Sequence, residues 1–300
     1  MSRILVTGVD GFTGRYLAPA LAAEGHEVHG LLQRERPAGL PLLEGVHAVH
    51  VCELLDAKGL LRVAADLRPD KVVHLAGISF VGHGDVGDIY ATNLVGTRHL
   101  LAALAAGDAP PSAIVLASSA NVYGNATAGV IDESLAPAPV NDYAVSKLAM
   151  EYMAATWREQ LPITLVRPFN YIGIGQSPSF LLPKIVDHFK RRAATLELGN
   201  LDVEREFSDV RTVADCYRRL LNAPAAGQTL NLCTGRGHTL RSVLQLATDL
   251  TGHSPEIRVN PAFVRANEVK KLVGSKVALE RAIGPVVGPT LRETLQWMLA

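Results

Sequence analysis

The chain is poor in the residues that build disulfide frameworks and metal centres. Its 300 residues include three cysteines (Cys52, Cys216 and Cys233), an odd number without CxxC spacing. This argues against a disulfide framework or a structural zinc site and favours a reducing compartment. The ten histidines do not fall into HxxxH or similar spacings, so we expect no metal.

Net charge and long apolar runs are also lacking. Lysine plus arginine (29) balance aspartate plus glutamate (29), so the charge does not favour nucleic acid or an anionic membrane as a partner. No apolar run approaches the ~18 residues of a membrane span. The first apolar stretch, residues 4–6, runs straight into a glycine turn and is therefore a strand rather than a signal peptide. We expect a soluble cytoplasmic protein without a membrane partner.

The chain is rich in short apolar segments that alternate with helical ones. Hydrophobic residues make up 48% of it, enough for a buried core. Strands are expected at residues 3–8, 26–32, 48–54, 71–77, 113–119 and 163–168. Helical patterns lie between them, at 14–23, 88–106 and 143–159. This alternation predicts an α/β fold with a Rossmann-type, doubly wound parallel sheet.

The rhythm changes after Pro168. A loop rich in Gly, Pro and Ser (170–179) precedes helical patterns at 181–192 and 238–252, with a strand pattern at 228–235. We therefore expect an NAD(P)-binding domain over residues 1–168, to which the strand at 228–235 returns. Residues 169–300 would mainly form a smaller C-terminal substrate-binding lobe.

A glycine-rich turn joins the first strand to the first helix. In TGVDGFTG (7–14), Gly8, Gly11 and Gly14 are spaced GxxGxxG. Glycines let the backbone turn tightly and approach a pyrophosphate at the positive end of the helix. A glycine-rich turn without a ligand is the alternative, but its place after a clean strand predicts a dinucleotide site.

The end of the second strand indicates which dinucleotide binds. A carboxylate there would favour NAD, but Leu32 is followed by Gln33, Arg34, Glu35 and Arg36. Two arginines could pair with a 2′-phosphate, so NADP(H) is favoured and NAD(H) remains possible. The alternative is a pair of solvated arginines. After the third strand, Glu53 and Leu54 are placed to frame the adenine.

A YxxxK motif follows the fifth strand by about two dozen residues. Tyr143 and Lys147 lie four apart on a predicted helix and so share one face. A carbonyl that accepts hydride needs a proton, and a lysine ammonium would lower the tyrosine pKa toward the working range. Ser119 would hold the carbonyl oxygen by a hydrogen bond. We therefore expect Ser119, Tyr143 and Lys147 to be catalytic.

These motifs occur together in a known family. TGVDGFTG, HLAG (74–77), SSANVYG (118–124) and YAVSK (143–147) resemble the extended short-chain dehydrogenase/reductases that act on nucleotide sugars. The resemblance implies a Rossmann domain, and it implies that Ser119 rather than Ser118 is the catalytic serine. The cofactor contacts it implies, beside those above, are Phe12, Thr13, Leu75, Ala76, Gly77, Asn93, Lys147 and Pro168.

The second half of the chain resembles a narrower group. RPFNYIGIGQ (167–176), FLLPK (180–184), LGNLDVEREF (198–207) and residues 265–268 resemble GDP-mannose 4,6-dehydratases and GDP-4-keto-6-deoxymannose reductases. The resemblance implies contacts to the diphosphate or sugar by Asn170, Lys184, Arg205 and Arg265, and to guanine by Glu268. Solvated surface charges are the alternative for each basic residue.

The loop after the fourth strand holds one more candidate. Ser79 is placed for a sugar hydroxyl contact.

One position separates the possible reactions. The dehydratases carry an acid, usually Glu, two residues after the catalytic hydroxyl. In this sequence that position is Asn121, which we expect to contact the substrate. An amide cannot remove the C5 proton, so reduction of a 4-keto sugar remains. The expected products are GDP-rhamnose, GDP-6-deoxytalose or a GDP-6-deoxyheptose. The related reductases often carry Asp at this position, so Asn121 departs from them as well.

Four other functions stay open. They are a GDP-mannose 4,6-dehydratase, a nucleotide-sugar 4-epimerase, a GDP-fucose-synthase-like epimerase/reductase and a non-enzymatic NADP-binding regulator. Members of the resembled family usually pair through two long helices, here about 88–106 and 143–159, so we expect a homodimer.

Overall fold

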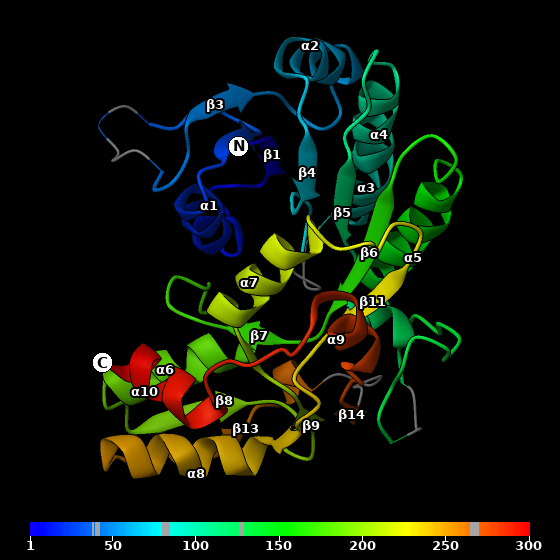
Figure 1. The fold of residues 1–300 in the computed structure, drawn as a ribbon. Coiled ribbons are helices and arrows are strands. Elements are labelled where there is room, and N and C mark those ends of the chain that lie inside the picture. Colours follow the sequence, from blue (N-terminus) through cyan, green and yellow to red (C-terminus); the bar gives the residue numbers. More distant parts are fainter. Residues whose placement is uncertain (38, 40–42, 80–84, 126–128, 265–269) are drawn as a thin grey trace.

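A seven-stranded sheet forms the centre of the molecule (Figure 1). The computed structural model describes residues 1–37, 39, 43–79, 85–125, 129–264 and 270–300. Neighbouring strands pair in parallel in the order β11-β6-β5-β4-β1-β2-β3. These strands are β1 (Arg3–Thr7), β2 (Glu27–Leu32), β3 (Ala48–Val51), β4 (Lys71–His74), β5 (Ala113–Ala117), β6 (Ile163–Pro168) and β11 (Thr229–Leu232). This is the Rossmann-type sheet expected from the sequence, and residues 229–232 lie within it.

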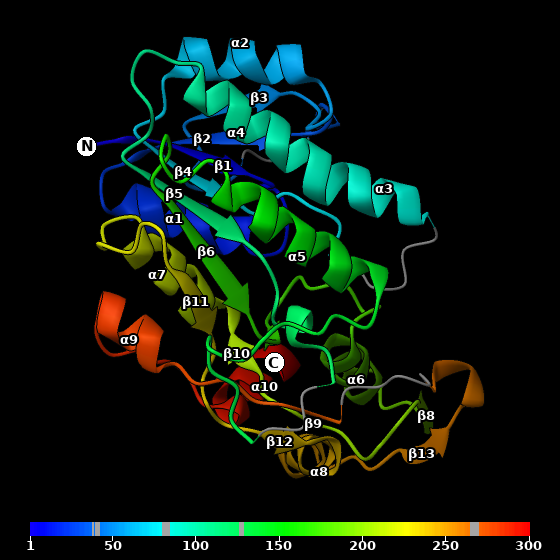
Figure 2. The ribbon, with the colours of Figure 1, turned by 90° about the vertical axis from the view of Figure 1, so that its right-hand side faces the viewer.

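Successive side chains of the strands point into two separate apolar cores. On one face, Ile4 and Val6 pack with α1 (Gly14–Ala23), α7 (Val210–Leu220) and α9 (Val277–Ile283). On the other face, Leu5 packs with α2 (Ala57–Leu67), α4 (Thr97–Ala105) and α5 (Asp142–Ala155). Figure 2 shows these helices on the two sides of the sheet. Burial on both faces explains why the strands are continuous apolar runs.

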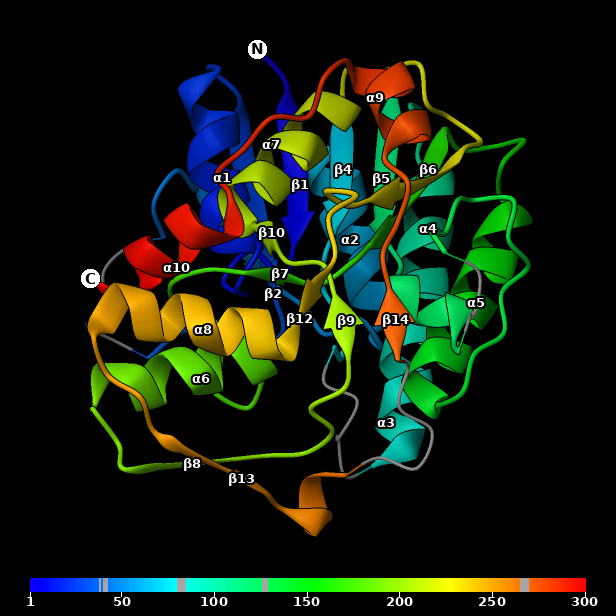
Figure 3. The same ribbon diagram turned by 90° about the horizontal axis from the view of Figure 1, so that it is seen from below.

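A third apolar core lies in the C-terminal half. It joins α6 (Leu181–Lys190), α8 (Leu240–Thr251) and α10 (Leu291–Leu299), which Figure 3 shows from below. Short strands accompany these helices: β7 (Tyr171–Ile172) with β10 (Ser208–Asp209), β8 (Thr195–Leu198) with β13 (Glu256–Val259), and β9 (Glu204–Arg205) between β12 (His238–Thr239) and β14 (Lys271–Leu272). The domain boundary at residue 168 stays a prediction.

Several elements differ from the sequence prediction. β4 and β5 end at His74 and Ala117, earlier than predicted, because the residues that follow leave the sheet as loops at its carboxyl edge. The long helix expected at 88–106 is α3 (Val86–Tyr90), a π-helical segment (Ala91–Gly96) and α4 in succession. In the described part of the chain, no helix is long and apolar enough to span a membrane.

Candidate active site

The strand order reverses at one place in the sheet. β1 lies between β2 and β4, so the chain leaves β1 toward one side and β4 toward the other. Loops diverge at such a switch point and leave a crevice at the carboxyl ends of the strands. The loops after β1, β4 and β5 carry the candidate residues of the site.

The loop after β1 forms a glycine cradle. Gly8 has a φ of 67°, and a Cβ there would lie 2.9 Å from the nitrogen of Ala76. A Cβ on Gly14 would lie 2.5 Å from the carbonyl oxygens of Gly8 and Val9. No described side chain caps the start of α1, and its first turn carries no acid. The residues therefore fit a dinucleotide whose phosphates sit at the helix terminus.

The loop after β4 is clamped to the catalytic helix by Asn93. Its Nδ2 donates to the carbonyl of Ile78 and to Ser146 Oγ, both at 3.1 Å, and its Oδ1 accepts from the Ile78 N–H at 2.9 Å. A Cβ on Gly77 would lie 2.8 Å from Asn93 Oδ1 and 3.4 Å from Lys147 Nζ. Asn93 thus ties the loop at Ile78 to Ser146 of α5, the residue before Lys147.

The three proposed catalytic side chains come from two neighbouring elements. Ser119 follows β5 and caps the 3₁₀ turn Ala120–Tyr123, where its Oγ accepts from the Asn121 N–H at 3.2 Å. Tyr143 and Lys147 lie on α5, which Asn141 caps. All three are buried, and Tyr143 hydrogen-bonds with Ser119. Lys147 Nζ donates to the carbonyl of Ala117 at 2.9 Å. The fold therefore brings the serine, tyrosine and lysine together.

The protonation of the tyrosine differs from the expectation. Burial raises the pKa of Tyr143 to about 12, although the hydrogen bond with Ser119 lowers it. Burial also lowers the pKa of Lys147 to about 8, against the raising effect of Glu151. Desolvation is the largest influence on the Tyr143 hydroxyl, so its pKa lies above the usual value of 10 rather than below it. Tyr143 is thus held as the neutral phenol, a proton donor.

The residues expected around the adenosine half lie further out on the sheet. Arg34 and Glu53 are exposed beyond β2 and β3. Leu54 is half-buried, and its Cβ would lie 2.7 Å from a Cβ added at Gly96. Pro168 ends β6 beside Leu232 of β11. These positions follow the carboxyl edge of the sheet, where a dinucleotide lies in this fold.

Among the substrate candidates, Asn170 has the clearest signature. Its Nδ2 is buried and has no hydrogen-bond partner among the described residues. A buried donor without a partner is destabilising, so a ligand that accepts this bond would relieve the penalty.

The other substrate candidates are more scattered. Asn121 is half-buried in the 3₁₀ turn and Ser79 is exposed. Lys184 donates to the carbonyl of Glu197 at 2.8 Å and lies 4.1 Å from the Phe263 ring centroid. Arg205 lies on β9 and donates to the carbonyl of Glu204. Arg265 and Glu268 lie outside the described residues.

One residue beside the site was missed in the sequence. The hydroxyl of Tyr171 lies 2.8 Å from Thr13 Oγ1, and its ring stacks on Phe12 with centroids 5.8 Å apart. It also raises the pKa of Tyr143. Tyr171 therefore joins the phosphate loop to the segment that begins at Asn170. Its position directly after Asn170 was the one sign in the sequence that Tyr171 lies beside the site.

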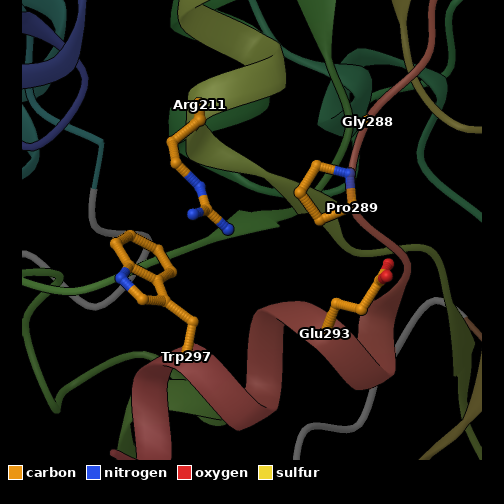
Figure 4. A pocket seen from close by; sticks show the side chains of 5 residues that line it. All are labelled: Arg211, Gly288, Pro289, Glu293 and Trp297. Carbon is orange, nitrogen blue, oxygen red and sulfur yellow. The ribbon is translucent and has the colours of Figure 1, made fainter.

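A second cavity, of about 510 Å³, lies between α7 and α10 (Figure 4). Arg211 points into it, but its guanidinium is paired with Asp209 at 2.6 Å and lies 3.9 Å from the Trp297 ring centroid. Glu293 is engaged in the cap of α10 through Thr290. Because its charged groups are already paired, this cavity is a weaker candidate than the residues gathered at the switch point.

Known proteins are similar to this chain over almost its whole length. The chain is 33% identical over 283 residues to a GDP-6-deoxy-D-talose 4-dehydrogenase of Aggregatibacter actinomycetemcomitans, which covers 94% of this chain and 91% of the relative. It is 34% identical over 309 residues to a GDP-6-deoxy-D-mannose reductase of Pseudomonas aeruginosa, which covers 99% and 96%.

Solved structures agree. A proposed epimerase from Burkholderia cenocepacia J2315 is 50% identical with a TM-score of 0.94, over 99% of this chain and 97% of that one. The RMD protein of Pseudomonas aeruginosa, solved with NADPH, is 33% identical with a TM-score of 0.83, over 100% and 98%. The model of the NAD dependent epimerase/dehydratase family matches residues 4–233. The chain is therefore an NAD(P)-dependent enzyme and belongs to the NAD-dependent epimerase/dehydratase family.

Proposed function

We propose that this enzyme reduces the C4 keto group of a GDP-4-keto-6-deoxy sugar with NADPH. The names of the two relatives above support a GDP-linked deoxysugar and chemistry at C4. GDP-rhamnose, GDP-6-deoxytalose and a GDP-6-deoxyheptose are the candidate products. They differ in which face of C4 receives the hydride and in the room needed near C6.

The observation that carries the proposal is Asn121. It follows Ser119 by two residues, the position at which the dehydratases that the chain resembles carry the acid that removes the C5 proton. A neutral amide cannot take that proton. A serine, a tyrosine and a lysine remain, which suffice for reduction of a carbonyl.

The protonation of Tyr143 is compatible with reduction. Burial raises its pKa to about 12, so the side chain carries the proton that reduction of a carbonyl consumes. When bound, the reduced nicotinamide supplies the hydride to C4 and is left oxidised.

Each of the three side chains has one task in this reaction. Tyr143 donates its hydroxyl proton to the oxygen that becomes the new alcohol. Ser119, which hydrogen-bonds with Tyr143, orients the carbonyl oxygen toward that proton. The ammonium of Lys147, held by the Ala117 carbonyl, stabilises the phenolate left behind. Asn170 Nδ2 offers a buried donor to the sugar nucleotide.

The preference for NADPH is supported at the tip of β2. Arg34 is exposed there, where it could pair with a 2′-phosphate, and the similar RMD structure contains NADPH. We further propose that the residues up to 168 bind this cofactor and that the C-terminal half mainly binds the sugar nucleotide.

A homodimer is also proposed. Val95, Val145 and Tyr152 are exposed by 40%, 37% and 67% along the π-helical segment and α5, a face that a second copy could cover. Helices α3 and α5 contact each other and so present one continuous surface.

The experiment is a comparison of two substrates. NADPH absorbance at roughly 340 nm is followed with GDP-4-keto-6-deoxymannose and, separately, with GDP-mannose. Consumption of NADPH with the keto sugar alone would support the reductase. Conversion of GDP-mannose to a keto sugar without loss of NADPH would identify a dehydratase, and a 4-epimer of GDP-mannose would identify an epimerase.

A further inference from the structure

A buried ion pair lies directly behind the catalytic residues. Glu151 on α5 and Arg167 on β6 are each 6% exposed. Arg167 Nε donates to Glu151 Oε1 at 2.9 Å, and its second nitrogen, Nη2, donates to Oε2 at 2.6 Å. A buried pair of this kind gains little stability over apolar side chains of equal volume, because both charges lose their hydration. Stability alone therefore does not account for it.

Both ends of the pair reach the segment that carries the catalytic serine. Ser118, which precedes Ser119, donates its hydroxyl to Glu151 Oε1 at 2.5 Å. Arg167 Nη1 donates to the hydroxyl of Tyr123, the last residue of the turn that Ser119 caps, at 2.9 Å. The Tyr123 hydroxyl continues to Asn231 of β11 at 2.7 Å. Residues 118–123 are thus held at both ends by one ion pair.

The same carboxylate acts on the lysine. Glu151 follows Lys147 by one turn of α5, so the two side chains share a face of the helix. Its charge raises the pKa of Lys147, which burial lowers to about 8. Tyr143, one turn earlier on α5, has a pKa of about 12, and His74 of β4, whose pKa the charge of Lys147 helps to lower, has a pKa of about 3. Both are neutral at pH 7, so among these groups Glu151 is the one whose charge favours the ammonium.

We propose that Glu151, with Arg167 as its partner, is a positioning residue that holds Ser119 in place and keeps Lys147 protonated during reduction. This inference rests on the proposed function for its turnover assay. It also makes a prediction about cofactor binding, which needs no turnover.

The central variant is Glu151→Gln, which removes the charge and nearly preserves the shape. We expect kcat to fall about 10- to 100-fold with a smaller change in the KM for the keto sugar. The decline of kcat/KM at high pH should move about one pH unit lower, because the Lys147 ammonium loses its stabilising charge. The affinity for NADPH should show the same shift in its pH dependence.

Two further variants separate charge from structure. Ser118→Ala keeps the carboxylate, so it should lower kcat without moving the decline at high pH. Glu280→Gln is the matched control. Lys276 and Glu280 are also a lysine and a glutamate four residues apart, with Nζ and Oε1 separated by 2.8 Å, and they lie away from the site. It should leave both kcat and the pH profile unchanged.

If Glu151→Gln does not fold, a double variant still tests the inference. Glu151→Gln leaves Arg167 buried without its counter-charge, which is strongly destabilising. The double variant Glu151→Gln/Arg167→Met removes both charges and should fold, with a smaller shift in the same direction, because the opposing positive charge of Arg167 is removed as well. An unshifted profile in a folded variant, for turnover and for NADPH affinity alike, would overturn the inference. If the wild type shows no turnover, but Glu151→Gln still shifts the pH dependence of NADPH affinity, the proposed function is overturned and the inference about Glu151 stands.

Discussion

At the scale of single residues, the site divides proton donation, orientation and charge among three side chains. Tyr143 keeps its proton because burial opposes the phenolate. Lys147 sits at the carboxyl end of β5 through its bond to Ala117, and Ser119 contacts the tyrosine hydroxyl. Removing one member should therefore affect the chemical step more than the binding of either ligand.

The substitution Tyr143→Phe tests this division. We expect kcat to fall about 10²- to 10⁴-fold, because the alkoxide loses its proton donor. The Kd for NADPH, followed by fluorescence titration, should change less than about threefold, which is under about 1 kcal/mol in binding free energy. Turnover close to that of the wild type would remove Tyr143 as the donor.

Arg34 is the residue that we propose sets the preference for NADPH over NADH. The substitution Arg34→Ala should raise the KM for NADPH about tenfold or more, since a charged hydrogen bond to phosphate is lost. The KM for NADH should barely change, because NADH lacks the 2′-phosphate. Steady-state kinetics with both cofactors measure this, and equal effects would contradict the assignment.

At the scale of elements, the sequence predicted the strands of the parallel sheet better than it predicted their ends. The apolar runs of β4 and β5 are clear, but Leu75–Gly77 and Ser118–Ser119 are also compatible with a strand. They leave the sheet because side chains from distant segments hold them, as Asn93 holds Ile78 and Glu151 holds Ser118. Such long-range contacts are not visible in local patterns. Arg167 inside an apolar strand was the available signal that a buried partner exists.

A buried hydrogen-bonded chain also joins β1, β4 and α4. His74 lies between Thr7 Oγ1 at 2.7 Å and Thr97 Oγ1 at 2.9 Å. Burial and then the nearby Lys147 lower its pKa from 6.5 to about 3. Because the folded pKa is depressed, the contribution of His74 to stability is complete above 6.5 and is lost progressively as the pH falls toward 3.

Urea unfolding at two pH values tests this linkage. Between pH 7 and pH 5, His74 should account for about 2 kcal/mol of lost stability. In His74→Gln, which cannot titrate, the loss over this interval should be smaller by that amount. An identical pH dependence in the two proteins would contradict the proposed role of His74.

At the scale of the whole molecule, the parallel sheet and its glycine-rich loop could be predicted from the sequence. The part of the C-terminal half built on α6, α8 and α10 was harder to predict. Its strands have two to four residues, too few for a pattern to be distinctive. Tyr171 became visible as part of the site only when the fold brought it to Thr13 and Phe12. The exposed apolar side chains on α5 are likewise a property of the folded surface.

The proposed dimer is tested by Tyr152→Glu. A charge at this exposed position of α5 should shift the protein toward the monomer in sedimentation velocity, because it would be buried in the interface. Val287→Glu, at an apolar residue that is 84% exposed in the loop before α10, is the matched control and should not change the mass. A monomeric wild type, or an unchanged dimer in Tyr152→Glu, would contradict this interface.

Isotope transfer measures hydride transfer to C4 of a GDP-linked keto sugar most directly. The enzyme is given GDP-4-keto-6-deoxymannose with NADPH that carries deuterium at the transferred position, and the product is examined by NMR. We expect one deuterium at C4, and the configuration of that carbon identifies the product. A product without deuterium at C4, or recovery of unreacted keto sugar beside intact NADPH, would contradict this expectation.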